Sequence, residues 1–262
     1  MVSALLLQTR EWGAGVQLTA GAEAWLGLAG LVLFAGGWSL LVLRALLRQG
    51  RYRATGVLTA EDLAAVHAAL GAAERRTVGE ILPVVLERSD RYPGAAWLAS
   101  LVALGSGSLL LAPWLPWHAP LLVLLAQLGL VAAGHACARA LPGVLRLFVS
   151  AARAREMAEE QAFQEFHRHE LTRTAGRTGV LLFVSLLEHR AVVLADEGIA
   201  ARVGPEAWQA TNAAVLEGIR CGSLRDGLIA GIRSAGALLA EHAPVAEGDR
   251  NEVPDRVIVR RE

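Results

Sequence analysis

The charged positions of this chain leave one long stretch that is free of charge. No Asp, Glu, Lys or Arg occurs between Arg91 and Arg139. A transmembrane helix needs about 20 apolar residues, so the stretch has room for two, which we expect at residues 94–112 and 119–138. Residues 113–118 read PWLPWH, where prolines end a helix and tryptophans favour the membrane–water interface. The pattern therefore predicts a transmembrane helical hairpin.

A second uncharged stretch lies upstream and predicts one more transmembrane helix. Residues 24–43 are apolar or small, between Glu23 and Arg44. A cleaved signal peptide is the alternative, but Arg44 stands where the cleavage site should be and the apolar run is long for one. The sequence favours a retained helix, preceded by an extracytoplasmic tail at residues 1–23.

The arginines predict the orientation of these spans. They gather after the first span, before the second and after the third, at Arg44, Arg48, Arg51, Arg53, Arg88, Arg91, Arg139, Arg146, Arg153 and Arg155. The loop of the hairpin carries no charge, and the only basic residue of the tail is Arg10. The positive-inside rule then places the N-terminus outside and residues 44–93 and 139–262 in the cytoplasm. We expect a multi-pass protein of the inner (plasma) membrane, with the lipid bilayer as a partner.

The segment at residues 54–93 reads as one helix and one strand. Thr59 and Asp62 have the spacing of a capping box, and apolar residues follow at helical spacing, namely Leu63, Val66, Leu70 and Ala73. Residues 80–86 read as a strand that contains Pro83. Because proline cannot donate to a ladder, this strand is predicted at a sheet edge or with a bulge.

The segment at residues 152–244 alternates helices and strands. Its predicted elements are a polar helix at 153–171, a strand at 179–187, a turn at 188–190, a strand at 191–195, and helices that begin at Pro205 and Ser223. The first strand is continuously apolar, as expected of a strand covered on both faces. The tail at 245–262 is polar, although residues 256–259 could add a short strand.

The segment at residues 54–93, one helix and one strand, cannot bury its own apolar face alone, but together the two segments have the size of an ordinary domain. The predicted fold class is therefore α/β: one small domain, made of residues 54–93 and 152–244, which the transmembrane hairpin interrupts. Hydrophobic residues make up 54% of the chain, and 25 basic residues balance 25 acidic ones. This neutrality argues against a nucleic-acid partner, which would need a basic patch. Cys137 and Cys221 have no metal-site spacing and are expected to be buried apolar residues.

Several motifs of the soluble segments resemble those of TPM domains. They are AERRTVGEI at 73–81, TGVLLFVSLLEHR at 178–190, ADEGI at 195–199 and GSLRDGL at 222–228. The resemblance covers about residues 54–93 and 153–243, and it is closest to a bacterial membrane subgroup whose TPM domain is split by a membrane hairpin. It implies an α/β/α sandwich with a small sheet.

The resemblance also implies chemistry, which this sequence carries only in part. Other TPM domains include a protein of photosystem II repair with phosphatase-like activity and divalent-metal binding. In those members an acidic pair precedes the first Gly-Val-Leu, whereas residues 53–58 read RATGVL here, with no acid. Divalent metals and phosphate transfer require clustered carboxylates. The departure argues against phosphatase chemistry.

The remaining acids give a candidate site. Asp196 and Glu197 follow a predicted strand, where ligands often bind in α/β sheets, and Glu80 could join them if its strand lies alongside. The same pair before Gly198 is equally typical of a solvated turn. Residues 167–170 read HRHE, and histidines two positions apart diverge on a helix. We assign no catalytic, cofactor-binding or metal-binding residue beyond these three acids as candidates.

The predicted function is therefore an interaction role. We expect an integral membrane protein that presents a cytoplasmic TPM-like domain as a non-catalytic interaction or assembly module for an unknown protein partner. The alternative is a membrane-bound phosphatase or another divalent-metal-dependent hydrolase that uses Asp196, Glu197 and Glu80. A transport role for His118 and His135 is a weaker hypothesis, because intramembrane ionisable groups normally pair with one another.

Overall fold

A four-stranded mixed sheet forms the centre of the α/β domain, the part of the structure outside the predicted hairpin. The computed structural model describes residues 40, 43–45, 47, 58–112, 114, 118–245 and 256–260. The strands are β1 (Ile81–Leu86), β2 (Val180–Ser185), β3 (Arg190–Ala195) and β4 (Ile258–Arg260), in the order β3-β2-β1-β4. β1 is parallel to both β2 and β4, and β3 is antiparallel to β2. The tail predicted at 1–23, nearly all of the helix predicted at 24–43 and most of the tail at 245–262 lie outside these residues.

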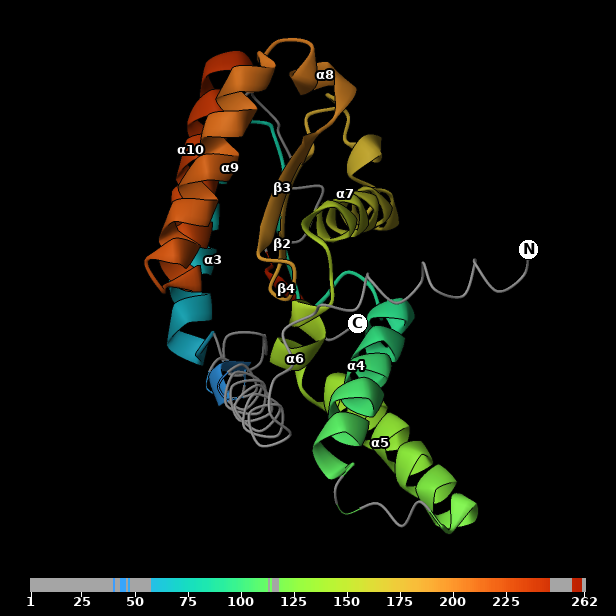
Figure 1. The fold of residues 1–262 in the computed structure, drawn as a ribbon. Helices are drawn as coiled ribbons and strands as arrows, with labels where there is room; N and C mark the ends of the chain where they lie inside the picture. The colour runs from blue at the N-terminus through green and yellow to red at the C-terminus, as the bar shows by residue number, and fades with distance from the viewer. Residues whose placement is uncertain are drawn as a thin grey trace, which may run out of the picture.

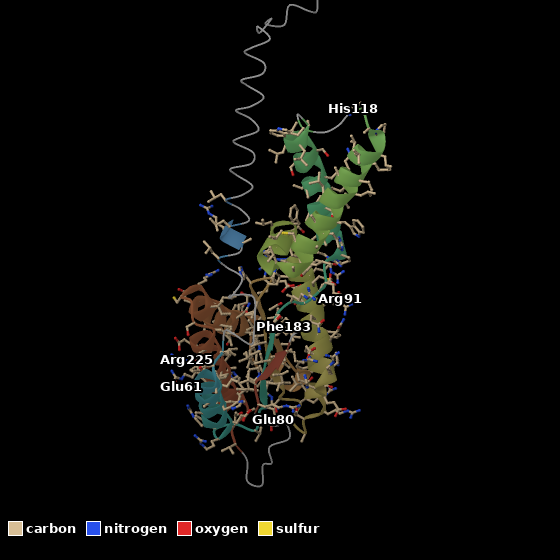
Figure 2. The ribbon with its side chains drawn as sticks, turned by 90° about the horizontal axis from the view of Figure 1, so that it is seen from below. Glu61, Glu80, Arg91, His118, Phe183 and Arg225 are labelled. Atoms are coloured by element: carbon tan, nitrogen blue, oxygen red, sulfur yellow. The ribbon has the colours of Figure 1, made fainter. Side chains whose placement is uncertain are left out.

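Helices cover both faces of this sheet. They are α3 (Ala60–Glu74), α7 (Ala151–Arg168), α8 (Glu197–Ala200), α9 (Pro205–Arg220) and α10 (Leu224–His242), with a short 3-10 helix η3 (Leu171–Arg173). Figure 1 shows α3, α9 and α10 on one face and α7 on the other. Every residue of β2 is buried, and Phe183 at its middle is fully enclosed on the α7 side (Figure 2). The predicted α/β fold and the strand covered on both faces are confirmed.

The prediction for the strand that contains Pro83 is wrong. β1 is an interior strand and pairs without a bulge along its whole length with β2. The Glu80 and Leu86 carbonyls accept from residues on the β2 side, so by alternation the nitrogen of Pro83 faces β4. The register with β4 begins only at Val84. Proline is tolerated here because no ladder hydrogen bond is required at its position.

The predicted hairpin is present as two helices, α4 (Pro93–Leu111) and α5 (Pro120–Ala140). Both are long and apolar enough to cross a membrane. Only 22% of the apolar window of α4 and 6% of that of α5 are buried, whereas a core helix of a soluble protein would be mostly buried. α4 and α5 project together from the α/β domain (Figure 1). These two helices are therefore candidate membrane spans, inserted between β1 and α7.

Small residues set the contact between α4 and α5. A Cβ on Gly134 would lie 2.6 Å from the Cβ of Ala103 and 3.0 Å from the Cα of Ser100. Within α4, Gly107 faces Leu130 in the same way, while Gly105 has open space around it. The small residue at Gly107 thus lets the two helices approach closely.

We expect Gly134→Leu to separate the two helices and to destabilise the hairpin by about 1–2 kcal/mol, as overpacking does. The same substitution at Gly129, which has open space around it, is the matched control in α5. Thermal unfolding of the detergent-solubilised protein checks both. Equal losses of stability in the two variants would contradict the close approach.

A short helix connects the hairpin to the domain. Residues 142–147 form α6 (Pro142–Leu147), and α7 begins directly after Ser150, which caps it. The backbone of Ala45 packs directly on Gly143 of α6. One apolar cluster thus joins the start of α4, the end of α5, α6 and Ala45. This cluster is distinct from the two clusters of the sheet.

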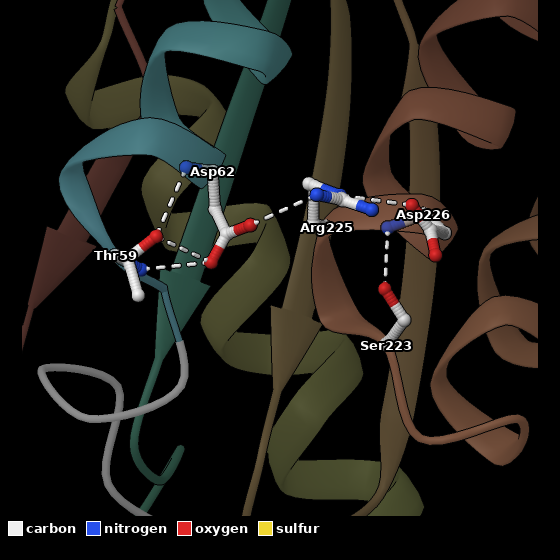
Figure 3. Close-up of polar contacts among 5 residues, drawn as sticks. All are labelled: Thr59, Asp62, Ser223, Arg225 and Asp226. Atoms are coloured by element: carbon white, nitrogen blue, oxygen red, sulfur yellow. Dashed lines mark hydrogen bonds and ion pairs between the residues drawn. The ribbon is translucent and has the colours of Figure 1, made fainter.

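The starts of α3 and α10 are joined by charged caps. Thr59 and Asp62 form the predicted capping box, and Ser223 caps α10 through the amide of Asp226. Arg225 lies between the two, with its guanidinium 3.3 Å from Asp62 Oδ1 and 2.9 Å from Asp226 Oδ1 (Figure 3). These contacts fix the relative position of two helices that are far apart in the sequence.

This cluster predicts a pH dependence. The backbone N–H and hydroxyl of Thr59, with Arg225, lower the pKa of Asp62 from its ordinary 3.8. A carboxyl whose pKa is lowered in the folded state stabilises the fold above the unfolded pKa, and this stabilisation is lost as pH falls through the folded pKa. We therefore expect Asp62→Asn to destabilise the protein at neutral pH and to have no effect well below pH 3.8. Chemical unfolding at the two pH values checks this; an equal loss at both would contradict it.

The two cysteines differ from the prediction in part. Cys137 in α5 is half-buried, but Cys221 at the end of α9 is exposed. The prediction of a buried Cys221 is wrong because the residue follows the last turn of the helix, where no neighbouring element covers it.

Candidate ligand-binding site

The acids predicted as a site lie at the end of the sheet where β1 and β2 begin. Glu80, Gly179 and Asp196 lie next to one another, each one residue beyond the end of β1, β2 or β3. Glu80 and Asp196 are therefore separated by the width of β2. The space between them is also occupied, since a Cβ on Gly179 would lie 2.4 Å from the carbonyl oxygen of Leu171.

The structure gives Asp196 and Glu197 local roles. Asp196 is buried and caps α8 by accepting the Glu197 amide at 2.7 Å. The exposed Glu197 forms an ion pair with Arg177. Asp196 Oδ2 is buried without a hydrogen-bond partner, so one oxygen could still accept. One oxygen does not make a cation site, and no group of three His, Cys, Asp or Glu residues within the described part of the chain could hold a metal.

A pocket of about 420 Å³ lies at the opposite end of the sheet. It opens where β1 and β4 end, at their carboxyl edge, which is where ligands bind in open α/β sheets. Three segments line it: the loop after β1, one face of α7 and the last residue of β4. The polar lining residues are Arg88, Ser89, Asp90, Arg91, Glu160, Gln161, Gln164, Glu165, Arg168 and Arg260.

Glu165 organises the inner wall of this pocket. Its side chain is fully buried, yet Arg168 donates to it at 3.0 Å and Gln161 at 3.1 Å. Arg260 of β4 forms a further short ion pair with the same carboxylate. Two guanidinium groups thus surround one carboxylate, which leaves an excess of positive charge beside the pocket.

His169 completes this cluster. Its Nε2 lies 3.2 Å from Glu165 Oε2. Burial lowers the pKa of His169, and Glu165 offsets this only in part. His169 is thereby held towards its neutral form and does not add to the charge of the two arginines. His167 points elsewhere, with its ring against Phe163, so the predicted divergence of the two histidines is confirmed.

A second buried carboxylate fixes the loop that lines the pocket. Glu188, in the β2–β3 turn, is 1% exposed. It accepts from the Tyr92 hydroxyl at 2.6 Å, from the Ser89 amide at 3.0 Å and from the Ser185 hydroxyl. Burial and the neighbouring carboxylate raise the pKa of Tyr92, so the phenol remains a donor. The residue immediately before α4 is therefore tied to the sheet.

Neither of these glutamates was among the site residues predicted from the sequence. A signal for Glu165 was present, because it continues the buried positions Ala154, Ala158 and Ala162 along one face of α7. A charged residue on the apolar face of an amphipathic helix indicates a buried ion pair. Glu188 had no such signal, since it lies in a turn between two strands. His189 beside it is exposed.

Comparisons with known proteins give one similar solved structure. No protein-family model matches the chain, and no curated protein matches it. The NMR structure of BA42 protein from the psychrophilic bacterium Bizionia argentinensis is similar with a TM-score of 0.49 and 22% sequence identity. The match covers 77% of this chain and 94% of that one.

Proposed function

We propose that this protein is a membrane-anchored binding module whose TPM-like α/β domain stands at the cytoplasmic face and acts without catalysis. The observation that carries the proposal is the set of hydrogen bonds that Glu188 accepts from Tyr92, Ser89 and Ser185, here called the Glu188 network. Because Glu188 binds Tyr92 and Ser89, the domain is held directly to the base of the hairpin. The carboxyl edge of the sheet, with its pocket, then faces the membrane.

Three further features support this reading. The helix–sheet–helix layers agree with the sandwich that the TPM resemblance implies. α4 and α5 leave apolar surfaces for a bilayer, and the arginine distribution favours the cytoplasmic side for the domain. Glu165 lines the pocket and Glu188 holds the loop that lines it; both are buried, and each is bound to several donors, as suits a structural role.

The orientation can be tested with the native cysteines. In a Cys137→Ala background, we expect Cys221 to react with a membrane-impermeant maleimide only after the membranes are opened. In a cysteine-free background, His118→Cys in the hairpin loop should react in sealed right-side-out membranes. The reverse pattern would overturn the cytoplasmic placement.

The alternative function is a membrane-bound phosphatase or another divalent-metal-dependent hydrolase that uses Asp196, Glu197 and Glu80. We expect no hydrolysis of a generic phosphoester with Mg²⁺, Ca²⁺ or Mn²⁺ beyond that of an Asp196→Asn/Glu197→Gln variant. Asparagine caps helices as well as aspartate does, so the variant retains the start of α8. Turnover by the native protein that the variant lacks would contradict the non-catalytic proposal.

A further inference from the structure

The pocket at the carboxyl edge of the sheet has the features of an anion site. Four arginines line it against three acidic residues, Asp90, Glu160 and Glu165. Of these acids, Glu165 is already bound by Arg168 and Arg260. The resulting field attracts a negatively charged group, and guanidinium forks match phosphate oxygens geometrically.

Arg260, which lines the pocket, is held in position by its neighbours. Arg260 Nε is buried and has no acceptor among the described residues, although a buried N–H is normally paired. Arg260 is fixed by its ion pair with Glu165 and by the Glu87 amide, which donates to its carbonyl at 3.2 Å. The guanidinium of Arg260 is therefore held in place beside the pocket before any ligand arrives.

The pocket lies close to the start of α4, which indicates the source of the anion. Arg91 lines it, and α4 begins at Pro93, so at most about 7 Å of chain separates the two. Figure 2 places Arg91 at the base of the hairpin and Glu80 at the far end of the domain. If α4 spans the membrane, the pocket lies at the level of the lipid headgroups, and basic pockets there bind anionic lipids.

We infer that this pocket binds a phosphate group at the membrane surface, namely the headgroup of an anionic phospholipid. The inference rests on the proposed membrane-anchored arrangement and names the ligand of its pocket. Arg88 and Arg91 approach the phosphate from the loop, while Arg168 and Arg260 form the inner wall around Glu165. Leu86 and Met157, which also line the pocket, give it an apolar side for the glycerol and acyl region.

The test is calorimetric titration of the full-length protein in a neutral detergent. The probes are short-chain phosphatidylglycerol, short-chain phosphatidylcholine and inorganic phosphate. We expect phosphatidylglycerol to bind and phosphatidylcholine to bind at least tenfold more weakly, with an affinity for phosphatidylglycerol that decreases as salt increases. Inorganic phosphate that binds as tightly as the lipid would assign the site to free phosphate and overturn the lipid source.

Two pairs of arginine variants distinguish binding at this pocket from nonspecific attraction of the lipid by exposed positive charges. Arg88→Gln/Arg91→Gln should weaken phosphatidylglycerol binding by about tenfold or more, and the corresponding lysine variant should restore only part of it, because lysine lacks the fork. The matched control is Arg75→Gln/Arg76→Gln, two exposed arginines at the far end of the domain, which should bind normally. Equal losses in both pairs, or none in the first, would overturn the site. A protein that binds no probe but keeps its orientation and lacks turnover would refute this inference alone.

Discussion

Replacement of Glu188 by alanine is expected to reduce the free energy of unfolding by about 4 kcal/mol. The side chain is buried, and its removal leaves the Tyr92 hydroxyl and the Ser89 amide without an acceptor. Each buried donor without a partner costs about 1–3 kcal/mol, and a cavity adds to the loss. Chemical unfolding in detergent, followed by tryptophan fluorescence, measures the change.

The same variant should loosen the junction between the domain and the hairpin. Arg88 and Arg91 lie in this loop, so trypsin should cleave there faster in Glu188→Ala than in the native protein. Glu159→Ala is the control, because Glu159 is exposed on α7 and such changes stay within about 0.5 kcal/mol. Unchanged cleavage in Glu188→Ala would show that the network does not hold the hairpin.

Replacement of Glu165 by alanine should have the second largest effect, a loss of about 3 kcal/mol. Removing one partner of a fully buried ion pair costs about 3–5 kcal/mol. The lower end applies because the side chains of Arg168 and Arg260 are 55% and 37% exposed and can turn towards water. Thermal unfolding measures this loss.

The effect of Glu165→Ala should concentrate on β4. This strand has only three residues, and Arg260 at its end is held by Glu165. Hydrogen exchange should therefore increase at β4 and at the Glu87 amide, which donates to Arg260, while β2 and β3 stay protected. Uniform faster exchange across the sheet would instead indicate a general loss of stability. Glu165→Gln, which retains an acceptor, should show a smaller change.

The elements that the sequence predicted correctly are those with local causes. The charge-free run predicts α4 and α5 from composition alone, and Thr59 and Ser223 begin their helices through bonds to residues three positions on. The position of β1 in the sheet was predicted wrongly because of Pro83. A proline is tolerated in an interior strand when its nitrogen faces a neighbouring strand whose pairing begins beyond it, as β4 does here. That information lies in residues 258–260, far along the chain.

The candidate site shows the same difference between local and distant contacts. Asp196 and Glu197 were chosen as an adjacent acid pair after a strand, but each found a partner nearby, in the Glu197 amide and in Arg177. The pocket depends instead on Glu165, whose partner Arg260 is 95 positions away. Helical spacing in one sequence can indicate that Glu165 is buried. It does not indicate which distant residue forms the ion pair with it.

The interruption of the sheet has a consequence for biogenesis. Ile81 of β1 pairs with Val180 of β2, and the hairpin lies between them. At a synthesis rate of about 5–20 residues per second, β1 waits roughly 5–20 s for its partner. The two apolar helices of the hairpin therefore leave the ribosome before β2 does. If α4 and α5 span the membrane, as proposed, they can insert before the sheet is complete, and pairing of β1 with β2 then takes place next to the bilayer.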